Sequence, residues 1–158
     1  MAETNEKPQP QLAIQRIYVK DLSFEAPSSP SVFLEKWEPQ VTIDLNSQAQ
    51  RINEGVYEVV LSLTVTAKAG DKTAYLVEVQ QAGIFSLTGF TDAELGVVLG
   101  SHCPGALFPY AREVVSDLVT RGTFPQLVLT PINFDALYAR HQQQKAAAAH
   151  KDNDPAKH

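Results

Sequence analysis

The chain has 158 residues, of which 44% are hydrophobic and 8% aromatic, values typical of one globular domain with a real core. Its net charge of −5 argues against nucleic acid as the main partner, because phosphate binding needs a basic surface. The single cysteine, Cys103, gives no disulfide framework, so an oxidising compartment is not required.

The N-terminal residues 1–10 are polar and lack the basic segment and apolar run of a secretory signal. They offer little apolar surface to offset the entropy lost on ordering, so we predict a disordered arm. No apolar segment of the sequence approaches the roughly 20 residues that a membrane-spanning helix needs. We therefore expect a cytoplasmic protein without direct membrane insertion.

The first half of the chain has the patterns of β-strands. Residues 12–24 are rich in β-branched and aromatic residues, and their apolar positions change phase near Ile17, which indicates a bulge. The segment APSSP at 26–30 ends this strand, because prolines cannot continue a ladder of hydrogen bonds. After a short aromatic crossover at 33–37, alternation at 41–46 predicts a second strand.

The third strand shows the clearest alternation, with polar residues on most of one face. This alternation predicts that one side of the strand is buried and the other lies in water. The apolar face consists of Tyr57, Val59, Leu61, Leu63 and Val65. A turn at 69–73 leads to a fourth strand at 74–85. Short links join antiparallel strands, and the helices expected after them predict an α+β fold.

The second half of the chain has helical patterns. We predict that Asp92 caps a short helix that runs to Leu99 and ends near Gly100. Pro104 suits the first turn of the next helix, where a missing N–H costs nothing. Gly122 is predicted to give this helix a left-handed exit. Its apolar stripe consists of Leu107, Ala111, Val114, Val115, Leu118 and Val119.

Asn133 is predicted to cap the last helix. The stripe of that helix consists of Phe134, Leu137, Tyr138 and His141. From Gln142 the sequence is of low complexity, and its alanines extend the helical pattern. Pro155 and the mixed charges around it predict that the end of the chain frays.

The sequence contains no evident catalytic constellation. His102 beside Cys103 is similar to the start of a thiol site, but adjacent residues rarely have the geometry that a Cys–His nucleophile needs. Cysteine more often acts as a small buried hydrophobe, which is the interpretation we favour. We find no metal-ligand spacing and no phosphate-binding loop. We therefore predict no enzyme activity, no catalytic residue, no metal site and no cofactor.

Two surface features remain. Asp21 and Glu25 share one face of the first strand, and Leu76 and Glu78 share one face of the fourth, so neighbouring strands would surround Leu76 with carboxylates. A solvated sheet face is the simpler interpretation, and a docking patch for a basic partner is the alternative. The second feature is the pair of aromatic residues at 33 and 37, because aromatic residues in loops are candidates for a binding surface.

Four long runs, in matching order and spacing, resemble the SecB family of bacterial protein-export chaperones: IQRIYVKDLSFEAP, VYEVVLSLTVTA, EVQQAGIFSLTG and HCPGALFPYAREVVSDLVTRGTFPQLVLTPINFDALY. The resemblance spans about residues 14–144. It implies a four-stranded antiparallel sheet backed by C-terminal helices within residues 11–144, assembled as a dimer of dimers. A flexible tail would follow at 145–158.

The resemblance also implies a function. The family holds unfolded precursor proteins without ATP, keeps them competent for translocation and delivers them to the SecA ATPase. We therefore expect unfolded precursors, SecA and other copies of the chain as partners, and no nucleic acid. The alternative is a chaperone dedicated to an antitoxin, and an enzyme that uses Cys103 and His102 is the third hypothesis.

Carried over residue by residue, the resemblance implies three sets of site residues. The acidic SecA-docking patch of the family falls on Asp21, Glu25, Leu76 and Glu78. For the groove that binds client proteins we predict Trp37, Val41, Ile43, Leu45 and Tyr138. The region near the contact between dimers would contain Val77, Val79 and Gln81.

Overall fold

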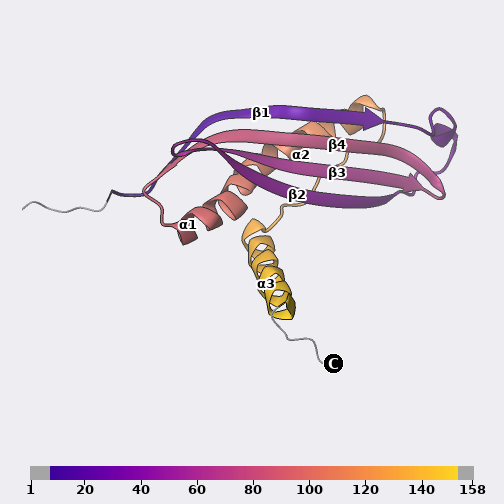
Figure 1. The fold of residues 1–158 in the computed structure, drawn as a ribbon. Coiled ribbons are helices and arrows are strands. Elements are labelled where there is room, and N and C mark those ends of the chain that lie inside the picture. Colours follow the sequence, from indigo (N-terminus) through magenta and orange to yellow (C-terminus); the bar gives the residue numbers. More distant parts are fainter. Residues whose placement is uncertain (1–7, 153–158) are drawn as a thin grey trace, which may run out of the picture.

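A computed structural model describes residues 8–152, and Figure 1 shows the fold. Residues 1–7 of the predicted arm and 153–158 of the predicted tail lie outside the described residues. The elements are β1 (Gln11–Glu25), the 3₁₀-helix η1 (Ser31–Leu34), β2 (Gln40–Asn53), β3 (Val56–Ala69), β4 (Lys72–Thr88), α1 (Asp92–Val97), the π-helix η2 (Val98–His102), α2 (Cys103–Arg121) and α3 (Phe134–Asp152).

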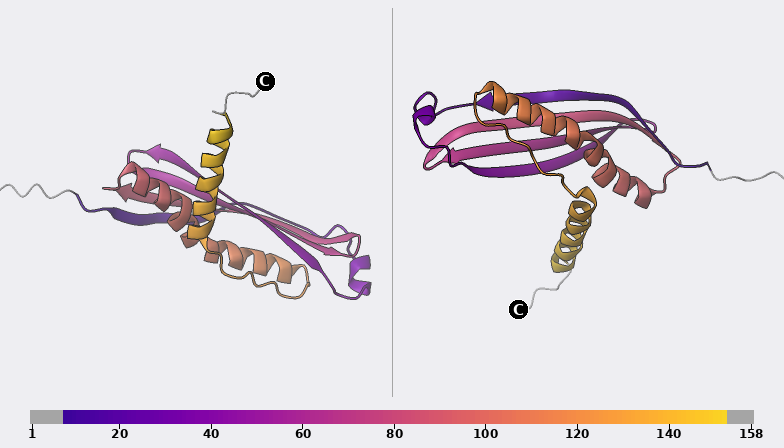
Figure 2. Two further views of the ribbon diagram at one scale, coloured as in Figure 1. Left: turned by 90° about the horizontal axis from the view of Figure 1, so that it is seen from below. Right: turned by 180° about the vertical axis from the view of Figure 1, so that it is seen from behind.

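The four strands form one antiparallel sheet, as predicted. The sequence left the strand order open, and the structure gives it as β1-β4-β3-β2, so that β1 and β2 are the edges. Helix α2 runs along one face of this sheet, which we call the helix face (Figure 2). Within residues 8–152 no helix covers the other face, which we call the open face. The α+β fold is confirmed, although α3 projects away from the sheet instead of backing it.

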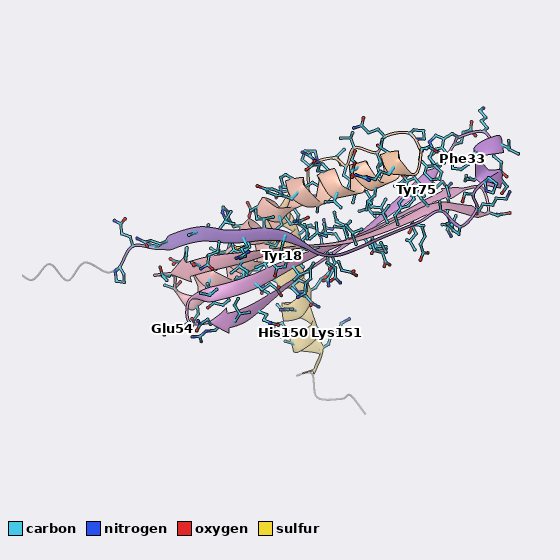
Figure 3. All side chains as sticks on the ribbon, turned by 90° about the horizontal axis from the view of Figure 1, so that it is seen from above. Tyr18, Phe33, Glu54, Tyr75, His150 and Lys151 are labelled. Atoms are coloured by element: carbon cyan, nitrogen blue, oxygen red, sulfur yellow. The ribbon has the colours of Figure 1, made fainter. Side chains whose placement is uncertain are left out.

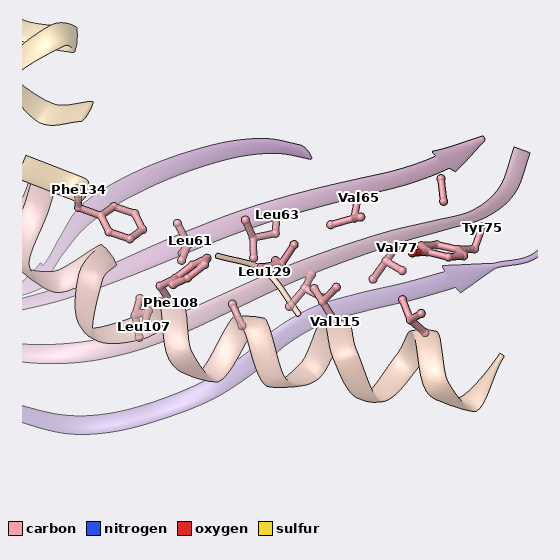
Figure 4. Close-up of a cluster of buried hydrophobic side chains, with 14 of the residues drawn as sticks. Leu61, Leu63, Val65, Tyr75, Val77, Leu107, Phe108, Val115, Leu129 and Phe134 are labelled. Atoms are coloured by element: carbon pink, nitrogen blue, oxygen red, sulfur yellow. The ribbon is translucent and has the colours of Figure 1, made fainter. Parts of the chain in front are cut away.

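The core lies between the helix face and α2 (Figure 4). The predicted alternation of β3 is confirmed, because Val59, Leu61, Leu63 and Val65 are at most 1% exposed. The stripe of α2 buries Leu107, Ala111, Val115 and Val119 completely against them. Full burial of a side chain such as leucine contributes about 1.5–3 kcal/mol, so this layer stabilises the fold.

Strand β1 contains two irregularities, which confirm the predicted bulge near Ile17 and add a second. The register with β4 shifts between Ile14 and Arg16 and again between Val19 and Asp21. Each shift inserts one residue and so reverses which positions face α2. The shifts keep the apolar residues on the helix face: Leu12, Ile14, Ile17, Val19, Leu22 and Phe24.

The predicted cap of α1 was wrong by one residue. The Thr91 side chain accepts a hydrogen bond from the Glu94 N–H at 3.2 Å, and the Glu94 carboxylate accepts one from the Thr91 N–H at 3.0 Å. This reciprocal capping box satisfies two donors at the helix start. Asp92 lies inside the first turn instead, where a negative charge favours the helix dipole.

The predicted end of the first helix near Gly100 was also wrong. The chain stays helical from α1 through η2 into α2, with only a local π-turn. Gly100 serves packing rather than termination, since a Cβ atom there would lie 2.5 Å from the ring of Tyr138. The glycine therefore lets α3 approach η2 closely.

The predicted left-handed residue at the end of α2 was wrong by one position. Gly122 has an ordinary φ of −75°, and the left-handed residue is Thr123, with φ of 65°. Gly122 allows the Phe24 ring to pack closely against the end of α2, because a Cβ atom at this position would collide with Cζ of Phe24 and lie 2.9 Å from its Cε1.

A Gly122→Ala variant is expected to lose about 1–3 kcal/mol of unfolding free energy, because the Phe24 ring must move within a packed region. Urea unfolding measures the loss. The matched control is Gly105→Ala, where the new Cβ atom would meet Phe134 at an ordinary 3.7 Å inside α2. That variant should be neutral or more stable, because alanine favours helices over glycine by about 1 kcal/mol. Equal stability of both variants would contradict the packing role.

Helix α3 begins as predicted, because the Asn133 Oδ1 atom accepts a hydrogen bond from the Ala136 N–H at 3.0 Å. It continues to Asp152, so the first part of the predicted flexible tail is helical. Beyond its first turns the helix stands clear of the sheet (Figure 1). None of the helices in the described part of the chain is both long and apolar enough to cross a membrane.

Candidate functional site

The predicted docking residues lie together on the open face, on two neighbouring strands. Glu25 lies directly opposite Leu76, and Ser23 lies opposite Glu78. Because faces alternate along a strand, Asp21 and Glu25 of β1 point to the same side as Leu76 and Glu78 of β4. We call these four residues the acidic patch: Asp21, Glu25, Leu76 and Glu78.

The acidic patch has the charge distribution of a surface that attracts cations. Its three carboxylates are exposed, and none of them forms an ion pair within residues 8–152. Leu76 is half-buried between them. The patch thus offers a small apolar contact inside a negative rim. Its role as a docking site stays a prediction.

The register adds one carboxylate that sequence reasoning missed. Asp44 lies opposite Thr64, and Thr64 lies opposite Glu78, so Asp44 is on the open face in the same row across the sheet. The alternation at 41–46 placed Asp44 away from the apolar face of its strand. The order of the strands was needed to put it on the same face as Glu78.

A hydrogen-bonded cluster that the sequence did not reveal lies on the open face beside the acidic patch. Tyr18 and Lys20 of β1 reach across β4 to the same Glu58 carboxylate on β3. The Tyr18 hydroxyl donates to Oε2, and Lys20 Nζ lies 2.9 Å from Oε1. We call these three residues the Glu58 cluster, and Figure 3 shows the position of Tyr18.

The cluster changes the titration of both acidic partners. The hydrogen bond from Tyr18, and then that from Lys20, holds the pKa of Glu58 below its usual value. Burial, and then the hydrogen bond to Glu58, raises the pKa of Tyr18 to about 12. At neutral pH the cluster therefore holds an ionised carboxylate between a neutral phenol and a cation.

The predicted client residues of β2 form an exposed apolar band. Val41, Ile43 and Leu45 lie on the helix face, opposite core positions of β3, but at the edge of the sheet beyond α2. Val41 is 39% exposed and Ile43 45%, whereas Leu45 is half-buried. An apolar strand edge that is this open can bind another chain. We call these three residues the β2 band.

One end of the β2 band meets a cleft of about 500 Å³ between β2, η2 and α3. Leu45 and Tyr138 both line it, so the structure brings these two predicted client residues together. Its other apolar lining, which sequence reasoning missed, includes Leu99, Phe134 and Leu137. The Ser101 hydroxyl donates to Asp135 and, together with Tyr138 packed on Gly100, attaches α3 beside the cleft.

The last predicted client residue, Trp37, lies in an aromatic cluster at the opposite end of the β2 band. Its ring centroid is 6.4 Å from that of Tyr75 and 5.4 Å from that of Phe124. Phe33 also packs on Phe124, at 5.3 Å, and is 48% exposed (Figure 3). The crossover aromatics therefore extend the core and still show one surface to solvent.

The residues predicted near the contact between dimers are core residues of this chain. Val77, Val79 and Gln81 are at most 3% exposed and lie on the helix face beneath α2. Gln81 donates a hydrogen bond to the Tyr18 carbonyl at 3.1 Å. A contribution of these side chains to an interface stays a prediction, and it would have to act through α2.

The thiol of Cys103 has the wrong properties for a nucleophile. It is fully buried, and burial raises its pKa to about 12, so the sulfur stays protonated at neutral pH. His102 beside it is exposed. Within residues 8–152, no group of three or more histidine, cysteine, aspartate or glutamate side chains is placed to hold a metal ion.

Comparisons with known proteins agree on one family. The family described as preprotein translocase subunit SecB matches residues 5–145. Protein-export protein SecB of Methylococcus capsulatus is 58% identical over 143 residues, which cover 90% of this chain and 92% of that protein. The protein of the same description from Nitrosococcus oceani is 62% identical over 142 residues, which cover 89% and 87%.

The fold is similar to that of a solved SecB-like chaperone from Mycobacterium tuberculosis, in complex with a peptide from an antitoxin. The TM-score is 0.60 with 20% identity, and the match covers 77% of this chain and 90% of that one. This likeness supports the arrangement of sheet and helices described above.

Proposed function

This chain belongs to the SecB family of preprotein translocase subunits, and on that premise we propose that it is an ATP-independent holdase of protein export. It binds unfolded precursor proteins and keeps them competent for translocation. The observation that carries this proposal is the exposed β2 band, which continues into the cleft beside Tyr138. We propose no catalytic role, and we place the protein in the cytoplasm, where precursors are made.

Client binding would use features that all unfolded chains share. Burial of apolar side chains is non-directional, so the β2 band and the cleft accept many sequences. Because β2 is an edge strand, its free backbone groups can also pair with an extended segment of any client. Trp37 and Tyr138 lie at the two ends of this surface and would hold aromatic or aliphatic side chains of the client.

We propose that the acidic patch docks the SecA ATPase, which receives the client. Its three exposed carboxylates without ion-pair partners among the described residues fit a basic surface, and Leu76 supplies an apolar contact. Complementary charge speeds encounter and selects the partner. The patch lies on the open face and the β2 band on the helix face, so one protomer has room for SecA and client together.

We propose that the chain assembles as a dimer of dimers. The edge strand β1 supports this, because its apolar residues on the helix face are only partly covered: Ile14 is 47% exposed, Val19 41% and Leu22 46%. Tyr110 of α2 is also 49% exposed. A second copy would cover such a surface. Val77, Val79 and Gln81 would affect contacts between dimers by supporting α2 from below.

A chaperone dedicated to an antitoxin is not favoured. The relatives named for protein export are 58–62% identical over about nine-tenths of the chain, whereas the antitoxin-bound chaperone shares 20% identity and supports the fold alone. Binding assays with several unrelated unfolded proteins separate the two functions, because a dedicated chaperone would hold one of them and ignore the rest.

The proposed function is tested by the solution mass from light scattering, with and without an unfolded client protein. We expect a tetramer of the 158-residue chain that gains the mass of the client when the client is unfolded and not when it is native. A monomer that ignores unfolded proteins would contradict both the assembly and the holdase function.

A further inference from the structure

We propose that Glu58 is a positioning residue for the acidic patch, because it holds the Lys20 cation away from the patch carboxylates. This inference rests on the SecA docking proposed above and concerns what keeps that surface negative. Glu58 would not itself touch SecA, and its effect would pass through Lys20.

Lys20 lies next to the acidic patch. It directly precedes Asp21, at the second irregularity of β1, where the register shifts between Val19 and Asp21. Its ammonium lies 2.9 Å from Glu58 Oε1, on the far side of β4. A lysine side chain is a flexible four-carbon stem with a compact charge, so without Glu58 it would be free to turn to Asp21.

The Glu58 side chain is held in place by its surroundings, so it can fix the position of the Lys20 ammonium. Its side chain is 14% exposed, compared with 46% for Lys20, and the Tyr18 hydroxyl donates to its other oxygen. Tyr18 lies opposite Ala82 of β4, whose small side chain is fully buried on the open face and leaves room for Tyr18 to cross to Glu58. The carboxylate therefore stays in place and ionised.

Arg16 and Lys68 are also cations of the open face. Arg16 lies in the row of Ile84 and Glu58, on the side of Tyr18 away from the patch. Lys68 lies two residues after Thr66, which is opposite Leu76, so it borders the Glu25 end of the patch, away from Asp21. Lys20 is therefore the cation that adjoins Asp21, and its partner affects the charge at the Asp21 end of the patch.

The test compares the affinity for purified SecA of full-length variants at low and physiological ionic strength. Glu58→Gln should weaken binding about threefold to tenfold at low salt, because Lys20 then neutralises part of the patch. The loss should shrink at physiological salt, where the Debye length falls to about 8 Å. The double variant Glu58→Gln with Lys20→Met should bind within about twofold of the wild type, since the freed cation is gone.

Two single variants complete the design. Tyr18→Phe keeps the Lys20–Glu58 ion pair and should bind SecA as the wild type does. A loss in this variant equal to that of Glu58→Gln would show a structural effect and overturn the proposal, as would a double variant that binds as weakly as Glu58→Gln. Lys20→Met alone should bind at least as tightly as the wild type, and weaker binding would likewise contradict the proposal.

Glu78→Lys separates failure of this inference from failure of the docking site. If Glu78→Lys weakens SecA binding and Glu58→Gln does not, the patch docks SecA and the positioning role is wrong. If neither variant changes the affinity, the docking site itself is wrong and the inference fails with it.

Discussion

A Glu78→Lys variant is expected to bind SecA at least about tenfold more weakly than the wild type at low ionic strength. The substitution changes the local charge by two units and puts a cation between Asp21 and Glu25, where it would pair with carboxylates that otherwise face the partner. Glu78 is exposed and has no ion-pair partner among the described residues, so the fold should be unaffected. Titration of labelled SecA at several salt concentrations measures the change.

The matched control is Glu54→Lys, which makes the same change of charge in the turn between β2 and β3 (Figure 3). Glu54 is exposed and uses only its backbone N–H in the hydrogen bond to Asn53. At physiological ionic strength this variant should keep the affinity for SecA within about twofold, because exposed charges farther apart than the Debye length of about 8 Å are largely screened. Equal losses in both variants would mean that net charge matters and the acidic patch does not.

An Ile43→Asp variant should bind unfolded clients about tenfold more weakly, because a carboxylate in the middle of the β2 band must lose its hydration when a client covers it. Ile43 is 45% exposed and lies at the sheet edge, so the unliganded fold should tolerate the change. Affinity for a fluorescently labelled unfolded protein measures the effect, and affinity for SecA should stay unchanged.

The control for this variant is Thr42→Asp, one residue away on the same strand. Thr42 lies opposite Thr66 and points to the open face, whereas Ile43 lies opposite Val65 and points to the helix face. The two variants thus place the same charge on opposite sides of β2. Client affinity that falls equally in both would place the client groove somewhere other than on the helix face.

Local patterns predicted most of the fold correctly, because each depends on residues a few positions apart. The alternation of Val59, Leu61 and Leu63 identified the buried side of β3. The change of phase near Ile17 indicated a bulge, since an inserted residue must reverse the faces of a strand. Asn133 was recognised as a cap from the helical stripe that follows it.

Where the local predictions were wrong, a residue had a second role that its own segment did not show. Glycine is typical of helix ends, yet Gly100 lies inside a continuous helical segment and makes room for Tyr138. Gly122 similarly makes room for Phe24, from a strand nearly a hundred residues earlier, while Thr123 takes the left-handed conformation. A glycine pattern does not distinguish conformational freedom from close packing.

The sequence by itself determined the α+β class, the buried face of β3 and, through family resemblance, the export function. It placed Asp21 and Glu25 on one face of their strand, and Leu76 and Glu78 on one face of theirs, since the period of a strand is local. Only the tertiary structure decided which faces adjoin, because the order β1-β4-β3-β2 depends on packing between segments far apart in the chain. That order puts Asp44 in the row of Glu78 and brings Lys20 to Glu58, 38 residues away, beside the surface proposed to meet SecA.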